Sequence, residues 1–175
     1  MSHNVKHSYG FVLIVVLIYL QLFSIFSLYA LENSLIASKQ SKNTLEQNRL
    51  FIAAERVLRF AENKLMSESP NCFIPITSVN DLLNKPVDWW QQTGCKGSIH
   101  ERSYYYIIEL LEDNPCAVAD NYQSSYYRIS VLLTTGDDDN NIRLQSTVIK
   151  PTKIDMVCNE KIYQVTPGRQ MWREL

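Results

Sequence analysis

The chain has 175 residues with a formal net charge of −1, and 46% of its residues are hydrophobic. This length leaves room for one modest folded domain beside a long helix. The near-neutral charge, with basic residues scattered along the chain, removes the electrostatic basis for strong nucleic-acid binding by the domain as a whole.

The segment Phe11 to Ala30, FVLIVVLIYLQLFSIFSLYA, carries no charge. Twenty residues that rise about 1.5 Å each form a helix of roughly 30 Å, which matches the hydrocarbon thickness of a bilayer. A removable export signal has a shorter apolar run and a small-x-small cleavage site, and Leu28 does not fit such a site before Ala30. We therefore predict a transmembrane helix over 11–31, with a short cytoplasmic N-terminus and an exported remainder.

A polar leader, residues 1–10, precedes this helix and ends in Gly10. A leader, a glycine and an apolar helix is the arrangement that prepilin peptidases cut after the glycine. We therefore expect processing between Gly10 and Phe11, which would leave Phe11 as the mature N-terminus. The alternative is an uncut signal anchor.

Beyond Leu31 the apolar residues thin out into a stripe. Their late members recur at steps of three and four, which indicates an amphipathic helix over 32–69 that packs one face against a domain. Pro70 ends this helix at the latest. The stripe comprises Leu35, Leu45, Leu50, Phe51, Ala54, Val57, Leu58, Ala61 and Leu65.

The remainder, 70–175, is expected to form a β-rich head. Residues 71–99 read as an irregular connector with one short helix at 79–83, and Trp89 and Trp90 are expected to pack in the core or to contact a partner. Strand signals follow at 103–111, 126–135 and 142–150, and the last two flank a polar turn and predict a hairpin. The tail from Ile154 offers one further strand at 162–165.

Four cysteines, Cys72, Cys95, Cys116 and Cys158, lie in the exported part without C-x-x-C spacing, which argues against a zinc site. Two disulfides explain them better, and three pairings are open. We favour Cys72–Cys95, which closes a local loop, and Cys116–Cys158, which would pin the C-terminal segment to the sheet. The alternative is four reduced, buried thiols.

Catalysis and metal binding find little support in the sequence. His100 is the one histidine of the expected head, and no phosphate or dinucleotide motif occurs, so we expect no enzyme activity and no cofactor. Asp137, Asp138 and Asp139 offer oxygen ligands for calcium but lack EF-hand spacing, so a solvated hairpin tip is the simpler interpretation.

The segment 51–62, FIAAERVLRFAE, resembles the F-x-A-A-E-x-x-L-R-x-A-E signature of PilX-type minor pilins of type IV pili. The motifs 127–129, YRI, and 144–146, LQS, are similar to strand motifs of that family. The signature residues here are Phe51, Ala53, Ala54, Glu55, Leu58 and Arg59, with Ala61 and Glu62 after them.

The resemblance implies an α+β, type IV pilin-like fold, in which a long N-terminal helix spans the membrane with its first half and packs its second half on a small antiparallel sheet. Subunits would stack by the apolar helix inside a fibre. The expected assembly interface is the start of the helix: Phe11, Val12, Leu13, Ile14, Val15, Val16 and Leu17. The implied partners are other minor pilins, the pilus assembly machinery, the prepilin peptidase and, before assembly, inner-membrane lipid.

Val15 departs from the pattern of major pilins, which carry a glutamate at the fifth position after the cleavage glycine. That glutamate is thought to pair with the N-terminal amine of a neighbouring subunit. A carboxylate without such an amine is costly at membrane depth. We therefore expect a place at the end of the pilus, in an initiating complex; a protein that never enters a filament is the plainer alternative.

Two classes of function stay open. One is a minor pilin at the end of, or within, a surface pilus, to which the minor pseudopilins of type II secretion are related. The other is an unprocessed single-pass inner-membrane protein whose periplasmic domain binds a partner.

Overall fold

The computed structural model of the chain describes residues 9–68, 70–134, 141–153 and 157–175. The chain divides after Gln47 into two units, and each is described by itself. Helix α1, Tyr9–Ser67, contributes its first part to unit 1 and its last part, from Asn48, to unit 2. The predicted aspartate-rich hairpin tip, with Asp137, Asp138 and Asp139, lies outside the described residues.

Unit 1 is helical throughout its described part. No glycine or proline interrupts α1 after Gly10, so each backbone N–H can bond to the carbonyl four residues before it. The helix is long and apolar enough to cross a membrane, with a mean hydropathy of 2.4 in its most apolar window. This supports the predicted membrane segment by length and composition.

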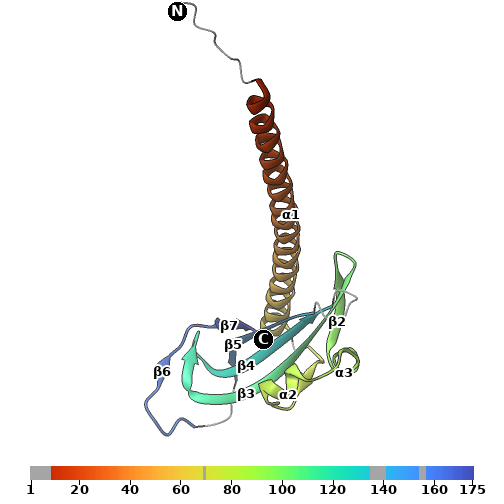
Figure 1. Cartoon of the computed structure of the whole chain (residues 1–175). Helices are drawn as coiled ribbons and strands as arrows, with labels where there is room; N and C mark the ends of the chain where they lie inside the picture. Colours follow the sequence, from red (N-terminus) through yellow and green to blue (C-terminus); the bar gives the residue numbers. More distant parts are fainter. Residues whose placement is uncertain (1–8, 69, 135–140, 154–156) are drawn as a thin grey trace, which may run out of the picture. The chain divides into compact units, whose positions relative to one another are not determined.

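Unit 2 is an α+β domain built on one mixed sheet of seven strands (Figure 1). Three long strands form its antiparallel centre, β3 (Arg102–Ala119), β4 (Tyr122–Leu133) and β5 (Ile142–Thr152). Strand β7 (Gly168–Glu174) pairs antiparallel with β5, and β2 (Cys95–Ile99) pairs antiparallel with β3. The two-residue strands β1 (Phe73–Ile74) and β6 (Tyr163–Gln164) pair parallel with β3.

The C-terminal part of α1 covers one face of this sheet. Its stripe residues interleave with every second residue of the central strands, such as Ile108, Val131 and Val148. Ala54, Leu58, Ala61 and Leu65 are fully buried there, as the stripe predicts. The prediction is wrong for the first two members of the stripe, Leu35 and Leu45, which are 63% and 52% exposed. Small alanines between the leucines let the helix backbone approach the strands closely, and the buried leucines supply most of the apolar area.

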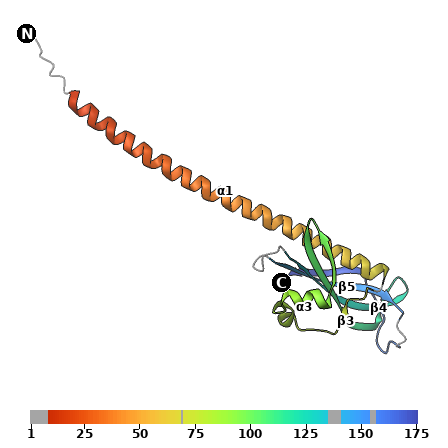
Figure 2. The same ribbon diagram turned by 90° about the vertical axis from the view of Figure 1, so that its right-hand side faces the viewer.

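The second face of the sheet is partly covered by two short helices, α2 (Val79–Leu83) and α3 (Val87–Thr93) (Figure 2). The α2 helix is confirmed, whereas α3 was missed inside the segment read as irregular. Trp90 on α3 is fully buried against Ile107 and Leu132, so core packing is the correct interpretation of this tryptophan.

The sheet corrects several expectations. It is mixed, not purely antiparallel, because the short strands β1 and β6 add parallel pairs at the edge of β3. Strand β3 continues to Ala119 instead of ending at Leu111, and it turns into β4 through Asp120 and Asn121, which have φ of 50° and 68°. Asp and Asn tolerate this left-handed backbone better than most residues, so they allow a two-residue hairpin.

Two side chains from the sheet secure the connections of unit 2. Lys150 Nζ on β5 donates to the carbonyl oxygens of Leu65 at 2.5 Å and Glu68 at 3.3 Å, which satisfies carbonyls left open at the end of α1. The fully buried carboxylate of Glu109 on β3 accepts from Arg128 on β4 at 2.6 Å and from the Thr77 N–H at 2.7 Å. These bonds hold the connector after β1 against the sheet.

Candidate functional site

The apolar surface of α1 in unit 1 is the most prominent surface of the chain. Every large hydrophobic side chain from Val12 to Ile36, except the partly covered Val15, is between 47% and 74% exposed. Soluble proteins seldom leave contiguous apolar patches larger than a few hundred Å² in water, and such patches mark contacts with lipid or protein. No described residue covers these side chains.

The expected assembly interface lies at the start of this surface. Val12, Leu13 and Ile14 are 61%, 65% and 57% exposed, and Val16 and Leu17 are 47% and 51% exposed. The proposed cleavage position, between Gly10 and Phe11, falls within the first turn of α1. Residues 1–8 of the expected leader lie outside the described residues.

The residues of the signature 51–62 divide by position on the helix. Ala53, Ala54 and Leu58 are buried in the core between α1 and the sheet. Phe51 is half-buried, and its ring lies 5.7 Å from that of Trp172 on β7. The apolar members of the signature therefore pack α1 on the sheet, which is a structural role.

The charged members of the signature lie at the edge of the same contact. Glu55 Oε1 accepts from Arg59 at 2.8 Å along the helix, and Arg169 of β7 lies 3.6 Å from the same oxygen. Arg169 also pairs with Glu62 at 2.8 Å. One arginine from the C-terminal strand thus joins two carboxylates that are seven residues apart on one face of α1.

Arg169, Lys150 and the buried pair Glu109 and Arg128 were missed by sequence reasoning. Arg169 and Lys150 contact α1 across about one hundred residues of chain, and no local pattern marks them. A charged residue in a strand of apolar neighbours, as Glu109 is within YYYIIELL, was the one available signal, because a buried carboxylate requires a partner.

An aromatic cluster flanks the helix near β2. The Phe60 ring meets those of Tyr104 and Tyr106 edge-on, at 6.4 and 6.3 Å. Burial raises the pKa of the Tyr106 phenol, with a smaller contribution from the neighbouring Tyr104. This cluster contributes packing, because Tyr106 belongs to the core between α1 and the sheet and Tyr104 packs against that core.

The cysteines form two disulfides, Cys72–Cys95 and Cys116–Cys158. The first joins the segment after α1 to β2, and the second joins β3 to the segment before β6. By loop closure each bond stabilises the fold by about 3–4 kcal/mol. This confirms the favoured one of the three possible pairings.

No metal-binding group emerges among the described residues, where His, Cys, Asp and Glu side chains do not gather in threes or more. His100 sits in the turn after β2 and its Nε2 lies 3.4 Å from an Arg56 guanidinium nitrogen.

Comparison with known proteins adds no relative: no protein-family model, curated protein sequence or solved structure matches the chain.

Proposed function

We propose that the chain is a minor subunit of a type IV pilus, inserted in the inner membrane, cut after Gly10 and then taken into the pilus or its initiating complex. The observation that carries this proposal is the apolar surface of α1 between Val12 and Ile36, which is exposed along its whole length. Lipid covers such a surface before assembly, and the apolar helices of other subunits cover it afterwards. One surface thereby serves both states.

Unit 2 supports the same proposal through its own construction. The last turns of α1 belong to the core of a disulfide-bonded α+β domain, so a subunit extracted from the membrane keeps a folded head. The buried residues Ala53, Ala54 and Leu58 contribute to this packing, and they belong to the signature 51–62 that resembles the PilX-type minor pilins.

Processing provides the most direct test. We expect the protein from wild-type cells to begin at N-methylated Phe11, and the protein from cells without prepilin peptidase to keep residues 1–10. Mass spectrometry of the intact chain measures both. Gly10→Leu should block the cut because a side chain replaces the hydrogen at the cleavage position, whereas Tyr9→Phe should be processed normally. An unprocessed chain in cells with active peptidase contradicts the proposal.

Position at the end of the pilus is a separate part of the proposal, and it rests on Val15. Val15→Glu would place a carboxylate in the membrane segment where an end subunit has no amine partner, at a cost of several kcal/mol. We expect fewer pili per cell by electron microscopy, with Val15→Leu as the apolar control. Normal piliation of the glutamate variant would contradict the end position and leave the processing test unaffected.

An unprocessed single-pass membrane protein is the second candidate. It is favoured by the same helix, which is long and apolar enough to span a bilayer without any further partner. In that case α1 remains in lipid, the chain keeps its leader, and unit 2 acts as a tethered binding domain.

A further inference from the structure

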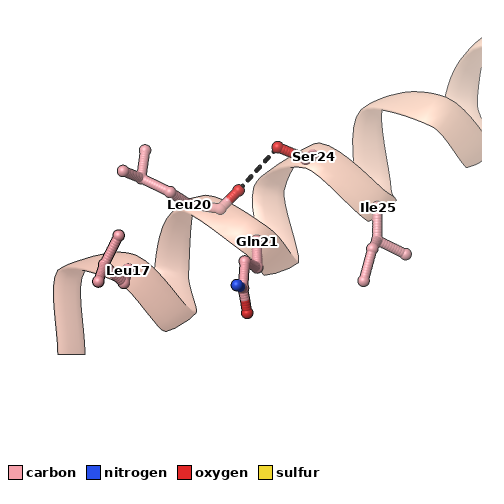
Figure 3. A pocket seen from close by; sticks show the side chains of 5 residues that line it. All are labelled: Leu17, Leu20, Gln21, Ser24 and Ile25. Atoms are coloured by element: carbon pink, nitrogen blue, oxygen red, sulfur yellow. Dashed lines mark hydrogen bonds between the residues drawn. The ribbon is translucent and has the colours of Figure 1, made fainter. Parts of the chain in front are cut away.

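A single amide interrupts the charge-free segment from Phe11 to Ala30. Gln21 lies at the middle of the segment from Phe11 to Ala30, and its side chain extends away from the helix between Leu17 and Ile25 (Figure 3). Together with Leu20 and Ser24 these residues line a shallow depression on α1. In a spanning helix, this position is close to the bilayer midplane, where water is absent.

The hydroxyl groups near Gln21 are satisfied within the helix. Ser24 Oγ donates to the Leu20 carbonyl at 2.9 Å, and Ser27 Oγ donates to the Phe23 carbonyl at 2.8 Å. The side-chain amide of Gln21 makes no hydrogen bond with any residue that the structure describes. Its amide carries two donors and an acceptor, and an amide left without partners in hydrocarbon is strongly unfavourable.

The residues around Gln21 form a seam of the kind that pairs helices. Gln21 and Ser24 occupy consecutive positions in a series that alternates steps of three and four, the spacing of a left-handed helix pair. Polar residues at single seam positions set the register of such pairs, and small residues such as serine let the backbones approach. The series is Ile14, Leu17, Gln21, Ser24, Leu28, Leu31 and Leu35.

We propose that this seam pairs two copies of the chain in parallel within the membrane, with their Gln21 amides hydrogen-bonded to each other. A second copy is the occupant that the chemistry fits, because each amide supplies both the donor and the acceptor that the other needs. Copies inserted in the same direction also hold Gln21 at the same depth, which a two-fold pair requires. The pairing depends on membrane insertion alone and goes beyond the function proposed above.

Cross-linking of the full-length chain in native membranes tests this pairing. The four native cysteines are all in disulfides, so a cysteine introduced by Ser24→Cys is the one thiol that copper phenanthroline can oxidise in the described structure. Phe26→Cys is the matched control, because two residues correspond to about 200° around the helix and place it on the opposite face. We expect a Ser24→Cys dimer on non-reducing gels at least about five-fold stronger than that of Phe26→Cys.

The role of the amide is tested in the Ser24→Cys background. Gln21→Leu should reduce the cross-linked dimer about five-fold, the typical effect of one interhelical hydrogen bond in model membrane peptides. Gln21→Asn should retain it in part, and Tyr19→Phe should leave it unchanged, because that phenol lies on the far side of the helix. Cells without prepilin peptidase should give the same result, which separates this inference from the processing test.

Three results would overturn the pairing. Equal cross-linking from both faces would show random collision, and an undiminished dimer with Gln21→Leu would show that the amide plays no part. A Gln21-dependent adduct between Ser24→Cys and a different membrane protein, without the self-adduct, would assign the seam to another helix.

Discussion

The two parts of α1 differ in how densely they carry apolar residues and in what those residues contact. Between Leu50 and Leu65 most apolar residues lie on one stripe that packs against the sheet of unit 2, and Ile52 and Phe60 are the exposed exceptions. Between Val12 and Ile36 the apolar residues surround the helix, and nearly all of them are more than half exposed. A helix with one apolar stripe can bury that stripe against its own domain, whereas a helix that is apolar on all sides is typically buried in lipid or among other protein segments.

The difference sets what each part can contribute. The stripe stabilises the folded head, so substitutions there should be measured as changes in unfolding. The all-round surface contributes to insertion and association, so substitutions there should leave the head folded. Four experiments follow from this contrast, from the largest expected effect to the smallest.

Leu58→Ala tests whether the buried part of α1 stabilises the folded head. Leu58 is fully buried, and removal of its side chain should lower the free energy of unfolding of the head by about 2–5 kcal/mol, through lost burial and a residual cavity. Urea unfolding of the full chain in detergent, followed by tryptophan fluorescence, measures this. The matched variant Leu20→Ala, at a side chain 59% exposed, should shift the transition by less than about 0.5 kcal/mol. Equal shifts of the unfolding transition in the two variants would contradict the view that only the buried part of α1 stabilises the head.

Leu20→Arg tests whether the exposed apolar part of α1 inserts into the membrane. A charge at the middle of a spanning helix raises the free energy of insertion by about 3 kcal/mol. We expect a larger fraction of the full chain to be released from membranes by alkaline carbonate. Leu45→Arg, at another exposed leucine of α1 beyond the apolar segment, is the control and should remain membrane-bound. Release of both variants alike would mean that the membrane segment extends further along the helix.

Lys150→Met tests whether the Lys150 side chain stabilises the C-terminal end of α1. The methionine keeps the length of the side chain but cannot donate to the Leu65 and Glu68 carbonyls, so we expect a loss of about 2 kcal/mol in urea unfolding. Lys161→Met, at an exposed lysine, should change stability by less than about 0.5 kcal/mol. If both lysines behave alike, the contact with the helix end does not contribute.

Alkaline pH should have the smallest effect on the stability of the head, through the buried phenol of Tyr106. Burial holds the pKa of Tyr106 above its ordinary value of about 10, so the folded state keeps its proton while the unfolded state loses it. Stability is therefore full below pH 10 and falls as the pH rises through the folded pKa. Tyr106→Phe should weaken this fall in urea midpoints measured from pH 9 to pH 11, with pH 7 as the reference. An unchanged slope would contradict the assignment.

Local patterns predicted the parts of the fold that local chemistry governs. The helix, its amphipathic stripe and its end before Pro70 follow from helix periodicity and the absence of breakers. The hairpin partners β4 and β5 and the inward side of Leu144 and Val148 follow from alternation along a strand. These features depend on residues close together in the chain, so a single sequence is enough to predict them.

The missed elements share a different physical basis. Strand β7 and the extension of β3 to Ala119 carry mixed polar sequences that pair only because a neighbouring strand already offers its edge. Helix α3 forms around Trp90, whose burial against the sheet outweighs the weak local signal of a seven-residue helix.

The sequence by itself determined that the long N-terminal helix begins with a charge-free segment that is long and apolar enough to span a bilayer, because helix length and hydropathy depend only on neighbouring residues. It also showed that the four cysteines all follow the apolar segment and that Gln21 lies within that segment. Only the tertiary structure decided which charges meet, as in Arg169 with Glu62 or Lys150 with the end of α1, because these contacts join residues about one hundred and more than eighty positions apart. Such pairs depend on how the strands and the helix pack in three dimensions, and the spacing of residues along the chain does not predict that packing.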